Sequence, residues 1–295
     1  MAVVVNTNVQ SLVAQRNLSS ASNSLSKATE RLSTGLRINK AADDAAGLFI
    51  AKGLEAQVSG SKQCQNNISL AINVLQIAEG DLTTIQDNVL RIKDLATQAA
   101  SGIYSTEGRT AIGNEIKARI NEINRVAKSS NFNGISLLTG EGSMADGLRL
   151  QVGPGSESET NSITIEDVFT DATADAFGLL ADGTGDTDTE VATAIEGHIA
   201  TPTASAAFIA NCETALNKLS EKRAKIGVEQ NRLEMASNGL AVSIENLSSA
   251  KSTIMDTDIA STTSDYTNAQ ILQQISTSML TQANQQPQIA LSLLG

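Results

Sequence analysis

Apolar residues recur at alternating steps of three and four along most of the chain, the spacing that aligns them on one face of a helix. The first such seam consists of Ala14, Leu18, Ala21, Leu25, Ala28 and Leu32. Further seams run through residues 68–99, 112–123 and 209–254, and the last one contains Leu272, Ile275, Met279 and Ala283. Because the connection between the second and third seams is short, those two helices should lie antiparallel. The pattern predicts a mainly α protein, built as a long, coiled-coil-like helical bundle.

The apolar period changes to two in the middle of the chain. Residues 148–152 and 163–165 alternate apolar and polar side chains on either side of the segment GPGSESET. This alternation predicts a small β-hairpin at about 148–167 with a long connecting loop. Residues 176–205 are rich in Gly, Asp, Thr and Ala, so we expect a surface excursion there and assign it no helix or strand.

The segment ERLSTGLRINKAADDAAG, residues 30–47, interrupts the first helical pattern. Gly35 follows the last seam residue, where a left-handed C-terminal cap is expected. Asp43 or Asp44 should begin the next helix, because a carboxylate at that position accepts hydrogen bonds from free N–H groups and favours the positive end of the helix dipole. The segment therefore predicts an abrupt joint between two helices.

Composition agrees with helix packing and excludes several classes of protein. Aromatic residues make up 2% of the chain and there is no Trp, so the core must consist of aliphatic side chains and Ala. The formal net charge is −11, concentrated between Glu141 and Glu196, and no basic surface indicates nucleic-acid binding. No apolar run approaches the ~20 residues that span a bilayer, so membrane insertion is not expected. The first residues, MAVVVNTN, lack the basic and apolar regions of a cleavable signal peptide.

Candidate catalytic and metal-binding residues are few in the sequence. The one histidine, His198, is not part of an HExxH motif, and its Gly/Thr/Ala-rich setting favours a surface loop. Cys64 and Cys212 lack the paired spacing of a zinc site. On antiparallel helices these two cysteines would lie beyond the reach of a disulfide, so we expect free, buried thiols. The sequence therefore predicts neither an enzyme nor a cofactor.

The two ends of the chain are almost free of charge. Residues 1–26 contain only Arg16, and no charged residue follows Asp265. Amphipathic helices of this kind are marginally stable alone, because helical stability comes mostly from packing. Their uncharged polar faces can be buried without the large cost of desolvating ions. This pattern favours self-association of the terminal helices.

Four long segments resemble the terminal signatures of bacterial flagellin, in the order of that family. They are MAVVVNTNVQSLVAQRNL, ERLSTGLRINKAADDAAGL, RINEINRVAKSSNFNGISLL and AQILQQISTSMLTQANQQPQIALSLL. The resemblance implies an inner domain in which N- and C-terminal helices pair, residues 1–42 with 255–295. It implies an outer helical bundle, residues 43–175 with 206–254, that carries the β-hairpin. Only 176–205 remains for the family's variable insertion.

The resemblance also implies what the chain does. It would be a structural subunit, exported unfolded through the flagellar type III channel, that self-assembles outside the cell into the helical filament for swimming motility. Its partners would be further copies of itself, the flagellar cap and hook-associated proteins, and an export chaperone at the C-terminal region. A hook–filament junction protein and, from a different class, a soluble coiled-coil adaptor are the alternatives. Uncharged termini and the continuous match favour flagellin.

The resemblance assigns roles to three groups of residues. Assembly through the inner helices would involve Leu18, Leu25, Leu32, Leu272, Ile275 and Met279. The joint between the two helical layers would comprise Arg31, Gly35, Arg37, Asp43 and Asp44. Both arginines should face carboxylates of neighbouring segments or subunits, because an isolated buried charge is costly. A host Toll-like receptor would contact Arg91, Leu95 and Glu115, although Leu90 stands where recognised members of the family usually carry Gln.

Overall fold

The computed structural model describes residues 7–140, 147–180 and 188–292. The chain forms two compact units, Met1–Ser59 with Ile244–Gly295, and Gly60–Ser243. The helices are α1 (Val9–Thr34), α2 (Ala45–Ala99), α3 (Thr106–Ser129), α4 (Ser158–Asn161), α5 (Asp188–Ile199), α6 (Pro202–Met255) and α7 (Ile259–Ser292). The strands are β1 (Asn131–Phe132), β2 (Ile135–Ser136), β3 (Leu148–Gln151) and β4 (Ser162–Ile165). The prediction of a mainly α protein with long helices and a small hairpin is confirmed.

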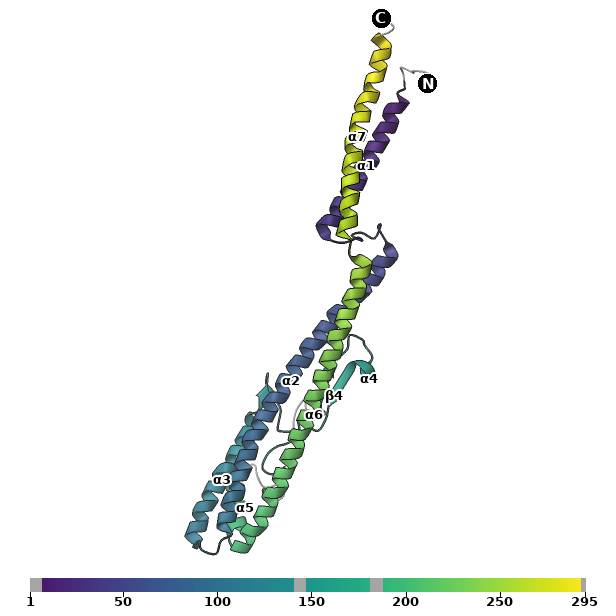
Figure 1. Ribbon diagram of the computed structural model, residues 1–295. Coiled ribbons are helices and arrows are strands. Elements are labelled where there is room, and N and C mark those ends of the chain that lie inside the picture. Colours follow the sequence, from purple (N-terminus) through teal and green to yellow (C-terminus); the bar gives the residue numbers. More distant parts are fainter. Residues whose placement is uncertain (1–6, 141–146, 181–187, 293–295) are drawn as a thin grey trace. The chain divides into compact units, whose positions relative to one another are not determined.

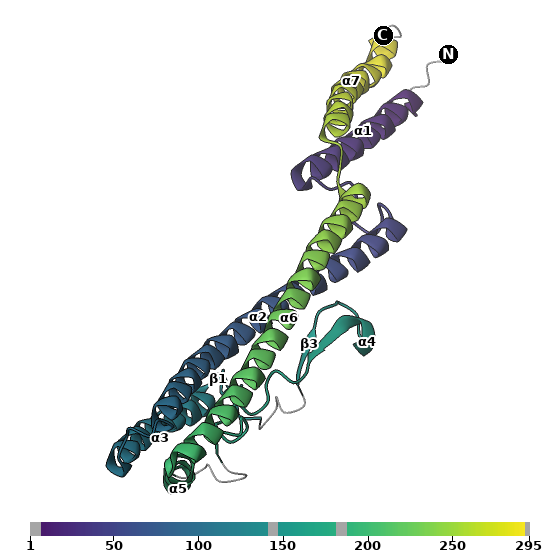
Figure 2. The same ribbon diagram turned by 60° about the horizontal axis from the view of Figure 1, so that its bottom comes forward.

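In the first unit, the terminal helices α1 and α7 lie side by side (Figures 1 and 2). They are antiparallel, because Asn8 at the start of α1 contacts Ala283 near the end of α7, and Gly35 contacts Thr257 at the opposite ends. The buried side chains of this pair are small: Ala14, Ala21 and Ala28 on α1, and Thr262, Ala269 and Ala283 on α7. The leucines of the first seam are only half-buried. The expected pairing of the terminal helices is confirmed.

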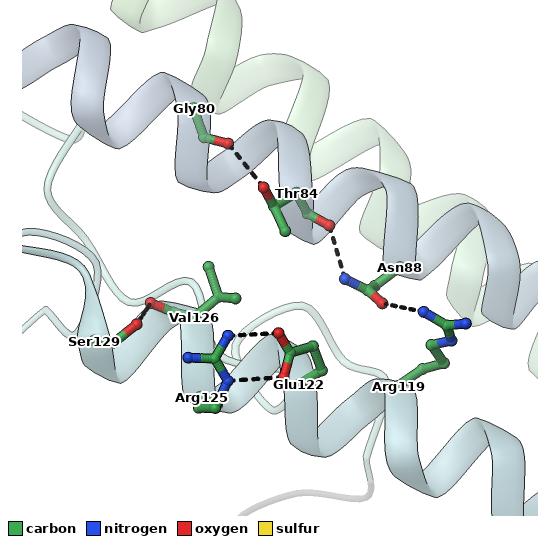
Figure 3. Close-up of polar contacts among 8 residues, drawn as sticks. All are labelled: Gly80, Thr84, Asn88, Arg119, Glu122, Arg125, Val126 and Ser129. Carbon is green, nitrogen blue, oxygen red and sulfur yellow. Dashed lines mark hydrogen bonds and ion pairs between the residues drawn. The ribbon is translucent and has the colours of Figure 1, made fainter.

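In the second unit, α2 packs antiparallel against both α3 and α6. Toward its C-terminal end, α2 meets α3 through Asp81 with Ser130 and then Asn88 with Arg119, the second of which appears in Figure 3. The contacts with α6 likewise run in opposite directions along the two helices, from Glu79 with Gln230 to Gln86 with Arg223 and Lys93 with Glu213. The short connection therefore predicted the orientation of α3 correctly.

The core of this unit is aliphatic, as the composition predicts. Its fully buried side chains include Ile68, Leu75, Leu82, Ile85, Ile92, Ile116, Ile120 and Ile123. Arg223 and Gln230, which interrupt the apolar seam of α6, are accommodated because Gln86 and Glu79 of α2 supply polar partners at the same level. Such a polar layer favours one register of two packed helices over its neighbours.

Two antiparallel hairpins complete the second unit. β3 pairs with β4 in the register Leu148 with Ile165, so the predicted hairpin is confirmed, and its long loop contains the short helix α4. β1 and β2 form a second hairpin that the sequence analysis did not predict. Its two turn residues, Asn133 and Gly134, both have positive φ, at 52° and 80°. Asn-Gly between two strands is a strong signal for a tight hairpin turn.

Helix α5 lies in the stretch for which the sequence analysis expected no element. Val191, Ile195 and Ile199 are buried at helical spacing on its inner face, and Ile195 and Ile199 face Gly113 of α3. His198 is on the last turn of α5 and stacks on Phe208 at 4.6 Å between ring centroids, so its placement in a surface loop is wrong. Burial lowers the pKa of His198. The remainder of the excursion at 181–187 lies outside the described residues.

Both cysteines are buried and free, as predicted. Cys64 lies on α2 and Cys212 on α6, and burial raises the pKa of both thiols, that of Cys212 to about 12. A thiol with so high a pKa carries almost no thiolate near neutral pH, so it is a poor nucleophile. These residues pack as small apolar groups.

Two lysines of α6 hold the segment at 170–177: Nζ of Lys218 donates to the oxygen of Ala176 at 3.0 Å, and the half-buried Lys222 makes several contacts. Nζ of Lys222 donates to the backbone oxygens of Thr170 and Asp171 at 3.0 and 2.6 Å, and to Oγ1 of Thr170 at 2.6 Å. The ammonium also lies 5.7 Å from the ring centroid of Phe177. Burial is the main cause that lowers the pKa of Lys222 to about 8, against the opposing effect of the Asp171 carboxylate.

The titration of Lys222 predicts a pH dependence of stability. Its folded-state pKa of about 8 lies below the ordinary 10.5, so the unfolded chain binds more protons between these pH values. The free energy of unfolding should therefore rise with pH over this interval, relative to a Lys222→Met variant. Urea unfolding of both proteins at about pH 7.5, 9 and 10.5 measures the difference, with Lys62→Met, at an exposed position of α2, as the control. A difference that stays constant across pH contradicts the prediction.

Candidate assembly surface of the terminal helices

The paired helices α1 and α7 border an open groove of about 1220 Å³. Apolar side chains from both helices line it and remain exposed: Val9 (62%), Leu272 (55%), Ile275 (52%) and Met279 (55%). Charged groups in the lining are confined to Lys27, Arg31 and Asp265, and the remaining polar residues are uncharged. Contiguous exposed apolar surface framed by polar groups is typical of an interaction site.

The residues predicted for assembly fall into two groups in the structure. Leu272, Ile275 and Met279 on α7 are all more than half exposed and line the groove. Leu18, Leu25 and Leu32 on α1 are half-buried beside the alanines that form the contact with α7. Of the residues predicted for assembly, those on α7 are therefore the more exposed to another chain.

The segment that follows α1 and the segment that precedes α7 are joined through their backbones. α1 ends at Gly35, which has φ 72° and ψ 4° and donates its N–H to the oxygen of Arg31 at 2.8 Å. The oxygen of Gly35 accepts from the N–H of Thr257 at 3.0 Å. Leu36 forms a β-bridge with Asp256. The left-handed cap predicted at Gly35 is thus present, and it directs the chain into these contacts.

A small core lies next to these backbone contacts. Ile38, Ala51 and Met255 are buried, with Leu36, Leu48 and Ile254 packed against them. The Nη2 group of Arg37 donates to the oxygen of Ile254 at 2.6 Å. The sequence analysis expected a carboxylate beside Arg37, and this expectation is wrong for the contact within the chain. A backbone carbonyl at the end of α6 satisfies the guanidinium instead, because such carbonyls have no partner within the helix.

The two aspartates act at the start of α2. Oδ1 of Asp44 accepts from the N–H of Gly47 at 2.8 Å, the capping bond that the sequence predicts. Oδ2 of Asp43 accepts from the N–H groups of Lys40 and Asn39 at 3.1 and 3.2 Å. These two hydrogen bonds lower the pKa of Asp43. Together the aspartates close the turn that separates α1 from α2.

The predicted receptor contacts are only partly on the surface. Nε and Nη2 of Arg91 donate to Oε1 of Glu115 at 3.0 and 2.8 Å, and the side chains are 48% and 41% exposed. Leu95 is 2% exposed in the core of the second unit. Its assignment as a contact residue is therefore wrong for the folded chain. Arg91 and Glu115 stay predictions.

Comparison with known families shows the family to which the chain belongs. The profile of the bacterial flagellin N-terminal helical region matches residues 5–143, and that of the C-terminal helical region matches residues 209–294. The chain belongs to the bacterial flagellin family. The resemblance seen in the sequence is confirmed, and both matched regions contain the terminal helices that border the groove.

Individual relatives of this flagellin extend over its whole length. The chain is 38% identical to the flagellar filament 30.7 kDa core protein of Treponema maltophilum, with 99% of this chain and 100% of the relative covered. It is 37% identical to the flagellin of Bacillus subtilis (strain 168), with 98% and 99% covered. A putative flagellar hook-associated protein from Vibrio parahaemolyticus shares the fold, with a TM-score of 0.57 and 15% identity over 72% of this chain and all of that one.

Features of other functional classes are absent from the described part of this flagellin. None of its described helices is long and apolar enough to cross a membrane. Over the same residues, His, Cys, Asp and Glu form no cluster of three or more that could hold a metal ion. The flagellin family is structural rather than enzymatic.

Proposed function

We propose that this flagellin is a structural subunit that self-assembles into the extracellular bacterial flagellar filament and supports swimming motility. The observation that carries the proposal is the exposed groove between the paired α1 and α7, lined by apolar and uncharged side chains. Covering such a surface with further copies removes apolar area from water and desolvates few ions. Full-length similarity to a flagellar filament core protein supports the same conclusion.

We further infer that the helix breaks separate an inner from an outer layer of the subunit. The inner layer would comprise 1–42 with 255–295, the outer one 43–175 with 206–254, and 176–205 would be the variable part. In support, α1 ends at Thr34, and the break between α6 and α7 follows Met255. The compact units divide the chain elsewhere, inside α2 and α6. The joint residues Arg31, Gly35, Arg37, Asp43 and Asp44 would fix the geometry between the layers.

Export and the remaining partners are proposals that follow from family membership. The chain would leave the cell unfolded through the flagellar type III channel, with a chaperone bound to its C-terminal region. It would meet the cap and hook-associated proteins in the filament. Host-receptor contact would rest on Arg91 and Glu115, which are accessible at the surface of the second unit. Pull-down of each purified partner with the full chain tests these contacts, and no binding contradicts them.

Polymerisation of the purified chain tests the proposed function. Incubated with sonicated filament seeds, the intact chain should form long filaments that sediment and are visible by negative-stain electron microscopy. Variants that lack 1–30 or 270–295 should stay in the supernatant, because each deletion removes one wall of the groove. A soluble coiled-coil adaptor would remain soluble when intact, and a hook–filament junction protein would form no long filaments. Either result would overturn the proposal.

A further inference from the structure

The contact between α1 and α7 is repetitive, so its apolar part discriminates poorly between registers. Ala14, Ala21 and Ala28 are spaced by seven residues on α1, and Thr262, Ala269 and Ala283 by multiples of seven on α7. Sliding one helix by a heptad, about 10.5 Å at 1.5 Å per residue, would again place small residues opposite each other. Polar groups must therefore contribute to the choice of register, as single polar positions do in coiled coils.

One backbone oxygen of α7 stands out because of the residue four positions later. In a continuous α-helix the oxygen of Ala283 would accept from the N–H of residue 287. That residue is Pro287, which has no N–H, although α7 continues to Ser292. Ala283 is only 7% exposed, and an unpaired carbonyl at such a site is costly. The sequence thus leaves the backbone oxygen of Ala283 without a donor inside the helix, on the face of α7 that meets α1.

The side chain of Asn8 occupies the position from which this acceptor is satisfied. Nδ2 of Asn8 donates to the oxygen of Ala283 at 2.7 Å. Its other end, Oδ1, accepts from the N–H of Ser11 at 3.0 Å and caps α1. Both ends of one amide are therefore used, one within α1 and one across to α7. A slip of one heptad toward the start of α7 would place Asn8 opposite Ser276, whose oxygen already has a partner inside the helix. A slip in either direction would leave the oxygen of Ala283 without the Asn8 donor.

We propose that Asn8 and Pro287 fix the register of α1 against α7 at one end of the helix pair, opposite the backbone contacts of Gly35 and Leu36 at the other end, and that they position the two helices for polymerisation. Pro287 frees the oxygen of Ala283, and Asn8 binds it. The two residues are thereby energetically coupled through a carbonyl that belongs to neither of them. The inference rests on the proposed function, because the paired helices form the surface on which subunits assemble.

The first test separates the two uses of the Asn8 amide. Asn8→Asp keeps an oxygen that caps α1 but replaces the donor with a second oxygen facing the Ala283 carbonyl. We expect the critical concentration for seeded polymerisation of the full chain to rise about five- to tenfold, the loss expected for one part-buried hydrogen bond. If the only role of Asn8 were to cap α1, Asn8→Asp would leave the critical concentration unchanged. Ser11→Ala, which removes the exposed bond from Ser11 to Asn284, is the matched control and should change it less than about twofold.

The second test asks whether the effect depends on Pro287. Pro287→Ala restores an N–H that can satisfy Ala283 within the helix, so Asn8→Asp in this background should change the critical concentration less than about twofold. The coupling would be overturned if Asn8→Asp raised the critical concentration equally in the native chain and in the Pro287→Ala variant. It would also be overturned if Asn8→Asp had no effect in the native chain. If the unaltered chain forms no filaments with seeds, the proposed function fails first and this inference falls with it. The native control thus distinguishes the two failures.

Discussion

Replacing Leu272, Ile275 and Met279 together with serine should raise the critical concentration for polymerisation of the full chain about 100-fold. Each side chain is more than half exposed in the isolated subunit and lines the groove between α1 and α7. Full burial of such a side chain contributes about 1.5–3 kcal/mol, so covering the exposed half contributes roughly 1 kcal/mol. Three losses of this size in every subunit correspond to a rise in critical concentration of about 100-fold. Seeded sedimentation over a range of protein concentrations measures this rise.

The matched control keeps the same surface apolar. Leu272→Met, Ile275→Leu and Met279→Leu, combined in one chain, should polymerise within a few-fold of the native protein, because volume-conserving apolar changes cost little. The serine variant should also keep the native thermal unfolding of residues 60–243, since none of the three residues belongs to that unit. Filaments from the serine variant at the native critical concentration would show that this face of α7 is not an assembly surface.

Local periodicity explains which parts of the fold could be predicted from the sequence. The long helices have apolar seams of several heptads. The seams of α1, α2, α3 and α6 are buried or half-buried in the structure, whereas in the seam of α7 Ala283 is buried and Leu272, Ile275 and Met279 are more than half exposed. α5 was missed because its apolar face consists of Val191, Ile195 and Ile199 alone, within a stretch dominated by turn-forming residues. The Asn133–Gly134 hairpin did carry a local signal, a dipeptide that favours two positive φ angles.

The candidate site was harder to predict because its contacts join residues far apart in the chain. Arg37 donates to the oxygen of Ile254, 217 positions away, and no local pattern identifies a backbone partner at that distance. A sequence motif placed Leu95 on the surface, but the structure buries it. Because α2 packs against more than one helix, it buries more positions per turn than the two of a coiled-coil seam. Caps such as Gly35 and Asp44 were predictable because each depends on its own neighbours.

Gly35→Val should impair assembly far more than Gly35→Asn. A Cβ added at Gly35 would meet no atom within 4 Å, but the backbone has φ +72°, so the cost of substitution is conformational. The left-handed region costs an ordinary residue about 1–2 kcal/mol and a β-branched one more, while Asn adopts it readily.

The contacts that depend on this conformation lie immediately after the glycine. If φ of residue 35 changes sign, the hydrogen bonds from Thr257 to Gly35 and from Arg37 to Met255 lose their geometry, and the bridge between Leu36 and Asp256 opens. We therefore expect Gly35→Val to raise the critical concentration at least about tenfold, Gly35→Asn less than about threefold, and Gly35→Ala to fall between them. Unfolding of residues 60–243 should be unchanged in all three variants, because the glycine lies outside that unit. Since Val and Asn find the same free space, equal effects of the two would mean that side-chain bulk in the filament, and not the left-handed backbone, explains the glycine.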